Sequence, residues 1–194
     1  MKYSIIYADP PWDHVSWKNG TRRPSLHYPV MSLEEIKRLP VREISAADCW
    51  LFLWATYPHL PEALEVISAW DFVYKTVAFT WVKRNKKKPT WFWGCGSYTR
   101  ANAEICLLAK KGNVQRVSAR VHSIVDSPIS EHSAKPEEVR RRIVELCGDL
   151  PRIELFARRR VDGWAAFGDE VEGSITLPAS GQTSAAAAKP RRRR

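Results

Sequence analysis

The chain has 194 residues, of which 44% are hydrophobic, and it carries a formal net charge of +10. This length fits one domain with a core of its own, and no apolar run reaches the roughly 20 residues that a membrane span needs. The basic balance suits a polyanionic partner such as nucleic acid. The N-terminal residues lack the long apolar stretch of a signal peptide, so we expect a cytoplasmic protein with no membrane association.

Short apolar segments along the chain predict β-strands, because they are rich in β-branched or aromatic residues and are closed by turn residues. The first segment stops at Asp9-Pro10-Pro11, since proline cannot extend a central strand. The segment 49–55 is apolar throughout, as expected for a strand covered on both faces. In chain order, the predicted strands are 3–8, 49–55, 77–83, 104–109, a short edge strand at 121–125, and 152–157, with a further element beginning at 164–167.

Helices are predicted between these strands. Ser32 and Glu35 have the spacing of a capping box, which predicts a short helix ending near Pro40. A second helix is expected at about 60–70, and a third at 136–147, where Gly148 suits the C-terminal cap. Two long polar or glycine-rich stretches are predicted to be surface loops, 12–29 and 84–101.

Alternating strands and helices predict an α/β fold with a mainly parallel sheet flanked by helices. In such sheets, ligands bind beyond the carboxyl ends of the strands, and Asp9 and Arg158 fall at such ends. Residues 1–172 are predicted to form this domain. Residues 173–194 are predicted to be a flexible, basic, low-complexity tail.

The tetrapeptide Asp9-Pro10-Pro11-Trp12 has the chemistry to activate an aromatic amine. The lone pair of such an amine, for example adenine N6, is delocalised into the ring, so acceptors must draw on its N–H groups. The Asp9 carboxylate and the Pro10 carbonyl can do this side by side, and the prolines stiffen their geometry. Trp12 supplies a ring that can stack on a base. From these residues alone, a strand that simply ends in a proline turn is an open alternative.

Further motifs follow this tetrapeptide in a fixed order, and together they resemble the MT-A70 family of adenine N6-methyltransferases. That family includes phage and bacterial DNA enzymes and the eukaryotic messenger-RNA enzyme. The match runs from about Ser4 to Glu170. The motifs are Tyr7-Ala-Asp-Pro-Pro-Trp-Asp13, Tyr28-Pro-Val-Met-Ser32, Trp50-Leu-Phe-Leu-Trp54, Trp81-Val-Lys83, Gly94-Cys-Gly-Ser-Tyr-Thr-Arg-Ala-Asn-Ala-Glu104, His132-Ser-Ala-Lys-Pro136, Ile153-Glu-Leu-Phe-Ala-Arg158 and Trp164-Ala-Ala-Phe-Gly-Asp-Glu170.

The resemblance implies a Rossmann-like class I methyltransferase fold with permuted order, in which the catalytic motif precedes the cofactor motif. It implies a site-specific, adenine-specific DNA-methyltransferase that uses S-adenosyl-L-methionine and no metal. The adenine would be flipped out of double-stranded DNA, in the cytoplasm of a bacterial host. Two alternatives stay open: an RNA adenosine N6-methyltransferase, and a non-catalytic nucleic-acid-binding partner subunit. Relatives work as homodimers or heterodimers, and we expect a homodimer.

The resemblance also implies roles for individual residues. Asp9 and the Pro10 carbonyl would bind the adenine amine for direct in-line attack, with Pro11 and Trp12 completing the catalytic motif. Lys135 precedes a helix N-terminus, where an ammonium and the helix both favour a cofactor carboxylate, and Asp169 stands where the family more often has asparagine. The substrate-binding residues would be Tyr28, Lys83, Arg84, Tyr98, Arg100, Asn102 and Glu104. The cofactor-binding residues would be Ser133, Lys135, Glu154, Leu155, Phe156, Arg158, Asp169 and Glu170.

Overall fold

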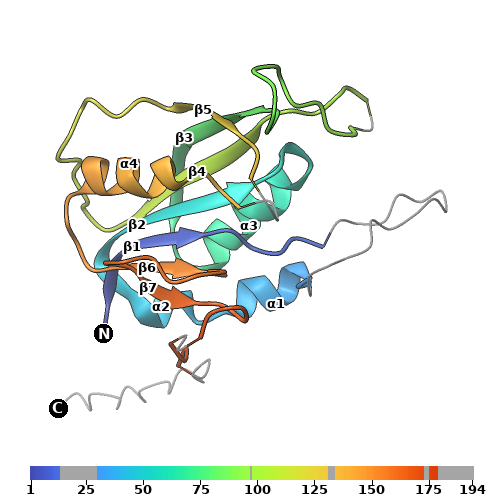
Figure 1. The fold of residues 1–194 in the computed structure, drawn as a ribbon. Coiled ribbons are helices and arrows are strands. Elements are labelled where there is room, and N and C mark those ends of the chain that lie inside the picture. Colours follow the sequence, from blue (N-terminus) through green and yellow to red (C-terminus); the bar gives the residue numbers. More distant parts are fainter. Residues whose placement is uncertain (14–29, 97, 131–133, 173–174, 179–194) are drawn as a thin grey trace, which may run out of the picture.

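A seven-stranded β-sheet forms the centre of the protein (Figure 1). The computed structural model describes residues 1–13, 30–96, 98–130, 134–172 and 175–178. The strands lie side by side in the order β5-β3-β4-β2-β1-β6-β7. Their bounds are β1 Tyr3–Ala8, β2 Ser45–Ala55, β3 Val73–Arg84, β4 Glu104–Lys111, β5 Ile124–Pro128, β6 Arg152–Leu155 and β7 Ala165–Phe167.

The sheet is mainly parallel, which confirms the predicted fold class. β1 pairs parallel with β2 and β6, and the pairs β3–β5 and β6–β7 are also parallel. Of the strands described, β4 alone runs the other way, antiparallel to β2 and β3. Because of this reversal, the first residue of β4, Glu104, lies at the edge of the sheet where the parallel strands end.

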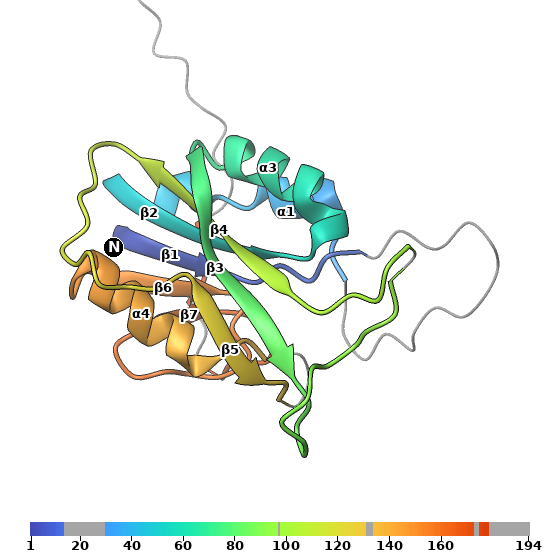
Figure 2. The ribbon, with the colours of Figure 1, turned by 90° about the horizontal axis from the view of Figure 1, so that it is seen from above.

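Helices cover both faces of the sheet (Figure 2). One face packs against α1, α2 and α3 and receives Ile6 and Ala8 of β1, whereas the other packs against α4 and receives Ile5 and Tyr7. Side chains of a strand alternate between faces, so β1 contributes to two cores. The helices are α1 Leu33–Arg38, α2 Val41–Ile44, the short 3-10 helix η1 Tyr57–His59, α3 Leu60–Ala69 and α4 Glu137–Cys147.

The predicted helix ends are present at α1 and α4. Ser32 Oγ accepts from the backbone N–H of Glu35, and the Glu35 carboxylate accepts from the N–H of Ser32 at 2.8 Å, which completes the capping box. Gly148 ends α4 with a φ of 89°, a conformation that favours glycine. Within the described ranges, no helix has the length and apolar character that crossing a membrane requires.

Several strands depart from their predicted bounds. β2 and β3 begin earlier than predicted, since their first residues are largely polar or exposed and gave no apolar pattern. β5 spans 124–128 rather than 121–125, because it pairs with Thr80–Arg84 of β3. Such pairing depends on neighbouring strands more than on local propensity. β6 ends at Leu155, before the predicted residue 157.

The packed body reaches past the predicted domain end at residue 172. The backbone N–H of Ile175 donates to the carbonyl of Ala166 at 2.9 Å. Ile175 and Leu177 also pack against the main core. Ile175 and Leu177 thus contact the body of the protein, and the domain end at residue 172 stays a prediction. Residues 173–174 and 179–194 of the predicted tail, like residues 14–29 of the first predicted loop, lie outside the described residues.

Candidate active site

Four charged side chains of alternating sign meet at the carboxyl edge of the sheet. Lys135 Nζ lies 2.7 Å from Asp9 Oδ2 and 3.3 Å from Glu104 Oε2. Lys83 Nζ lies 2.5 Å from the other carboxylate oxygen of Glu104. The lysine and Glu104 side chains are at most 15% exposed and Asp9 is 24% exposed. The cluster is thus largely shielded from water. Ion pairs are stronger in such a low-dielectric environment than at an exposed surface.

The topology of the sheet brings these four residues together. Asp9 directly follows β1, and Lys83 lies at the end of the parallel strand β3. Glu104 begins the antiparallel strand β4 opposite Trp81 of β3, so it enters the sheet at the same edge. Lys135 lies between β5 and α4. Four of the predicted site residues therefore form one chain of ion pairs, in the order Asp9, Lys135, Glu104 and Lys83.

The cluster holds Glu104 and Lys135 in their charged forms. Burial alone would raise the pKa of Glu104, but the ammonium groups of Lys135 and Lys83 outweigh it and hold that pKa below the ordinary value. Burial alone would lower the pKa of Lys135, but the carboxylates of Asp9 and Glu104 raise it above the ordinary value. At neutral pH, Lys135 is therefore a fixed cation rather than a general base.

Beside Asp9, the rest of the tetrapeptide forms a rigid turn. The Pro10 carbonyl accepts the backbone N–H of Trp12 at 2.9 Å, and its second lone pair leaves capacity for another donor. Trp12 is 8% exposed, donates from Nε1 to the Trp54 carbonyl at 3.1 Å, and stacks on His59 with ring centres 5.8 Å apart. The structure gives Trp12 interior contacts, and its place beside a base stays a prediction.

Two backbone segments that carry predicted cofactor residues touch at the same edge. Phe156, directly after β6, has a φ of 60°, a left-handed conformation that costs a non-glycine residue about 1–2 kcal/mol. The N–H of Ala157 donates to the carbonyl of Phe167 at 2.9 Å. A Cβ at Gly168 would lie 2.1 Å from the Ala157 carbonyl oxygen, so the close approach requires glycine. The predicted residues on these segments are Phe156, Arg158, Asp169 and Glu170.

Glu154 and Leu155 have interior partners. Glu154 is 7% exposed, and its carboxylate oxygens accept from Arg140 Nε at 2.8 Å and Nη2 at 2.6 Å. Leu155 is fully buried in the main core. The prediction that these two residues contact the cofactor therefore has no support beyond the sequence resemblance. Tyr28 and Ser133 lie outside the described residues.

Arg84 fixes the start of the loop between β3 and β4. Its guanidinium donates to both carboxylate oxygens of Asp126 at 2.7 Å and lies 3.4 Å from the centre of the Trp91 ring. The next basic residues, Lys86–Lys88, are exposed. With Arg84 and Pro128 they line a hollow of about 350 Å³. Arg84 thus shapes the loop, while the lysines present positive charge to the solvent.

Asn102 and Arg100 hold the second half of this loop. Asn102 Oδ1 accepts from the backbone N–H of Lys83 at 2.9 Å, and its Nδ2 donates to the carbonyl of Lys83 at 3.0 Å. Arg100 Nε donates to the carbonyl of Gly94 at 3.1 Å. Tyr98, in contrast, is fully exposed. Asn102 and Arg100 therefore have structural partners, and the substrate contacts of all three residues stay predictions.

Three buried residues beneath the cluster were assigned no role from the sequence. Trp54 Nε1 donates to the Tyr7 hydroxyl at 2.7 Å, and the Arg140 guanidinium lies 5.5 Å from the centre of the Tyr7 ring. Lys135 Nζ in turn lies 5.5 Å from the centre of the Trp54 ring. Arg140 had one signal, a charged residue next to Val139 on the apolar stripe of a predicted helix. Tyr7 and Trp54 stand in two of the motifs that carry the family resemblance, but as apolar strand residues they gave no indication of a role in the site.

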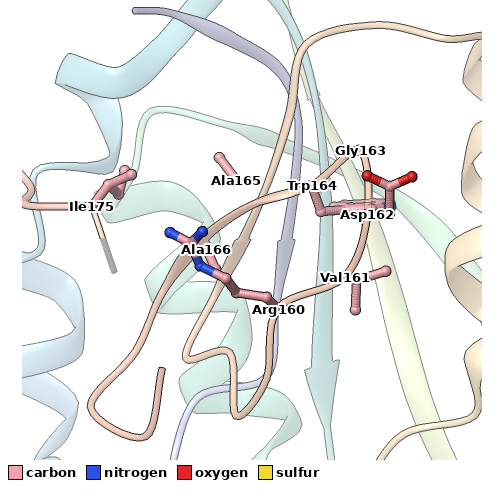
Figure 3. A pocket seen from close by; sticks show the side chains of 8 residues that line it. All are labelled: Arg160, Val161, Asp162, Gly163, Trp164, Ala165, Ala166 and Ile175. Atoms are coloured by element: carbon pink, nitrogen blue, oxygen red, sulfur yellow. The ribbon is translucent and has the colours of Figure 1, made fainter. Parts of the chain in front are cut away.

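Trp164, Ala166 and Ile175 are among the residues that line a cavity of about 430 Å³ (Figure 3). Its lining comes from the loop before β7, from β7 itself and from Ile175. Trp164 of this loop contacts Arg152, the first residue of β6, with 5.6 Å between Cζ and the ring centre. Since β1 and β6 are parallel, Asp9 lies beyond the opposite end of these strands. The cavity is therefore separate from the candidate active site.

The sheet order, the helices on both faces and the cluster at the strand ends define a Rossmann-like methyltransferase domain. The MT-A70 family profile matches residues 3–170, and the chain belongs to that family. The resemblance inferred from the ordered motifs, and with it the prediction of a methyltransferase, is confirmed.

Individual relatives agree with this assignment. The chain is 34% identical to the Type II methyltransferase M.MunI of Mycoplasma sp, over 93% of this chain and 83% of that protein. It is 27% identical to the human N(6)-adenosine-methyltransferase catalytic subunit METTL3, over 89% of this chain and 29% of that protein. It is 29% identical to the mouse N(6)-adenine-specific methyltransferase METTL4, over 87% of this chain and 37% of that protein. The match covers most of the first relative and under two fifths of the two mammalian ones.

Proposed function

We propose that this chain transfers the methyl group of S-adenosyl-L-methionine to N6 of an adenine in DNA. The observation that carries the proposal is the Asp9 carboxylate, held at the end of β1 by the Lys135 ammonium at 2.7 Å and adjacent in sequence to the Pro10 carbonyl. DNA is favoured because one relative, of which the match covers 83%, is named a Type II methyltransferase.

Asp9 and Pro10 act as paired acceptors for the amine. Lys135 engages Oδ2 of Asp9, and a carboxylate has about four lone-pair sites, so it can still accept an amine N–H. The Pro10 carbonyl accepts the second N–H through its remaining lone pair. Together they draw electron density toward the nitrogen and stabilise the positive charge that develops on it. Because the acceptors are fixed beforehand, little reorganisation accompanies the reaction.

The bonds and charges of the transfer balance. The lone pair of the amine nitrogen forms the new bond to the methyl carbon, while the carbon–sulfur bond breaks and its electron pair returns to sulfur. The nitrogen, now positively charged, loses one proton, and the Asp9 carboxylate beside it is the first acceptor. The proton then passes to solvent, since Asp9 is 24% exposed.

The residues at the strand edge fit S-adenosyl-L-methionine, which supplies an electrophilic methyl group when bound. The left-handed Phe156 and the close approach at Gly168 bring two backbone segments together beside the end of β1. Asp169 and Glu170 are exposed there and can accept from ribose hydroxyls. Lys135 has a third N–H for the cofactor carboxylate, beyond its contacts with Asp9 and Glu104. Among the described residues, no group of His, Cys, Asp and Glu could hold a metal ion.

The loop between β3 and β4 is the part proposed to meet the nucleic acid. Lys86–Lys88 are exposed on it, and so are Trp91, Trp93 and Tyr98, at 42%, 55% and 101%. Lysines contact phosphates, and exposed aromatic rings can stack on bases. A duplex adenine must leave the stack to reach Asp9, at a cost of a few kcal/mol. We also propose that the enzyme works in the bacterial cytoplasm as a homodimer, which sedimentation analysis would test.

RNA is the second candidate substrate, since a relative at 27% identity is named an N(6)-adenosine-methyltransferase. The same acceptors would serve either polymer, and only the recognition surface would differ. A non-catalytic partner subunit is disfavoured, because it has no need for a carboxylate paired with a buried ammonium at the strand end.

The test is transfer of a tritiated methyl group to double-stranded DNA, single-stranded DNA and RNA of matched sequence. Label in N6-methyladenine of DNA is the expected result. Label in RNA alone would move the substrate to RNA and leave the chemistry intact. If no polymer were labelled and the protein did not bind S-adenosyl-L-methionine, the proposal would be wrong.

A further inference from the structure

We infer that Trp54 is a positioning residue, which sets the Lys135 ammonium and the Trp12 turn relative to Asp9. The inference rests on the proposed function, because Asp9 and Lys135 are the groups being positioned. Trp54 is the penultimate residue of β2, fully buried, and it contacts the site through its backbone carbonyl and its ring.

Trp54 contacts two parts of the site, the Trp12 turn and the Lys135 ammonium. Its carbonyl accepts the indole N–H of Trp12 at 3.1 Å, which fixes the tetrapeptide turn after Asp9. The face of its ring lies under Lys135, with 5.5 Å between Nζ and the ring centre. A cation over a buried indole is held more strongly than one at an exposed surface. The Lys135 ammonium also pairs with the carboxylates of Asp9 and Glu104. The Trp54 ring is thus a third group that contacts this ammonium.

The contacts of Trp54 with Tyr7 and Trp81 hold its ring in one orientation. Its indole N–H donates to the Tyr7 hydroxyl at 2.7 Å, and its ring meets the edge of Trp81 with centres 6.5 Å apart. The Tyr7 ring lies against Arg140 of α4. A ring with an engaged N–H and fixed neighbours cannot rotate without leaving a buried donor unpaired.

These contacts form a closed loop of neighbours. Trp54 of β2 donates a hydrogen bond to the Tyr7 hydroxyl of β1. The Tyr7 ring contacts Arg140 in the first turn of α4, and Lys135 lies just before that helix. Lys135 then returns to the face of Trp54. A displacement of α4 would move Lys135 off Asp9. The contact between Tyr7 and Arg140 ties the sheet to α4, and the Trp54–Tyr7 hydrogen bond holds the Tyr7 ring in place for that contact. A misplacement of about 1 Å can cost up to about a hundredfold in rate.

Trp70 provides a matched control, because it is an ordinary core tryptophan. It is 1% exposed, and its indole N–H donates to the carbonyl of Ile36 at 3.0 Å. It belongs to the core cluster on the face covered by α1–α3, whereas Trp54 belongs to the cluster under α4. Removing either ring creates a comparable cavity and a comparable loss of stability, so any difference in catalysis reports on position.

The test compares Trp54→Leu and Trp54→Phe with Trp70→Leu and Trp70→Phe in the full chain, measuring kcat, the KM for S-adenosyl-L-methionine and the free energy of unfolding. We expect Trp54→Leu to lower kcat about tenfold or more with KM changed less than threefold. We expect Trp54→Phe to recover part of that loss, since it keeps an aromatic face under Lys135 but lacks the N–H that the Tyr7 hydroxyl accepts. The Trp70 variants, at similar stability loss, should keep kcat within about twofold.

Equal kcat values for Trp54→Leu and Trp70→Leu, or a Trp54→Phe variant no better than Trp54→Leu, would overturn the inference. Should Trp54→Leu not fold, Tyr7→Phe decides: it removes only the hydroxyl that holds the indole and should lower kcat at least threefold with little change in KM, and an unchanged kcat refutes the role. A wild-type protein that labels no polymer would instead refute the proposed function.

Discussion

The ammonium of Lys135 lies 2.7 Å from the carboxylate of Asp9, although the two residues are 126 positions apart in the sequence. The pair joins the end of β1 to the start of α4, and Glu104 shares the same ammonium. Asp9 is thus oriented before any substrate arrives. The role of Lys135 is therefore wider than the predicted contact with a cofactor carboxylate.

Glu104→Gln should destabilise the protein in a pH-dependent way. The pKa of Glu104 is held below its ordinary value, so its contribution is fully present above the unfolded pKa of about 4.3 and is lost as the pH falls through the folded pKa. The expected loss in unfolding free energy is about 3 kcal/mol at pH 7, and it should shrink below about pH 4. Urea unfolding at several pH values measures it, with the exposed Glu43→Gln as control. A loss that grew as the pH fell would contradict the account.

Arg140→Met should cost about 3–5 kcal/mol of stability, because it leaves the buried Glu154 carboxylate without its partner. The double variant Arg140→Met, Glu154→Leu should regain much of that loss, since no unpaired charge is left. A double-mutant cycle from urea unfolding gives the coupling between the two residues. Additive single effects would show that the pair is not coupled.

Gly168→Ala should weaken the binding of S-adenosyl-L-methionine and destabilise the fold by about 1–3 kcal/mol. The new Cβ would lie 2.1 Å from the Ala157 carbonyl oxygen and force the two edge segments apart. Gly94→Ala is the matched control, because its Cβ would meet Ala101 at 3.4 Å. Calorimetric titration and thermal unfolding measure the two effects. Equal behaviour of the two variants would remove the reason for glycine at position 168.

Replacing Lys87 and Lys88 by glutamine should reduce the salt dependence of nucleic-acid binding. If each lysine contacts one phosphate, the slope of log K against log salt should fall by about 2 in magnitude, since each contact contributes about 0.9. The control replaces Lys2 and Lys75 by glutamine, which removes the same total charge. These two lysines are exposed at the start of β1 and near the start of β3, whereas Lys87 and Lys88 follow the end of β3. Fluorescence anisotropy between low and moderate salt measures the slopes. Equal slopes in the two double variants would place the nucleic acid elsewhere.

The parts of the fold that the sequence predicted well depend on local pattern. The buried strand before Asp9, the capping box at Ser32 and the glycine at the end of α4 each follow from a few neighbouring residues. The early start of β3 and the shift of β5 did not, because the first residues of β3 pair with β4 and β5 pairs with Thr80–Arg84 of β3. Strand register is a tertiary property, and single-strand patterns do not contain it.

In the candidate site too, residue types could be predicted from the sequence, whereas the contacts between them could not. Residue type and motif order identified Asp9, Lys83, Glu104 and Lys135, which the structure joins in one cluster. The pairing of Lys135 with Asp9 was not predictable, because it joins the end of β1 to a residue just before α4, 126 positions further along the chain. Arg84 and Asn102 were expected to contact substrate, and their structural partners Asp126 and Lys83 appear only in three dimensions.

The most direct test of the central claim is methyl transfer by Asp9→Asn, measured beside its affinity for S-adenosyl-L-methionine. Asparagine keeps the shape of Asp9 but cannot offer a charged acceptor to the amine or pair with the Lys135 ammonium. We predict a loss in kcat of at least about a hundredfold, as expected on removing a preorganised electrostatic group, with cofactor affinity within a few-fold of wild type. An Asp9→Asn variant that kept full activity would contradict the mechanism.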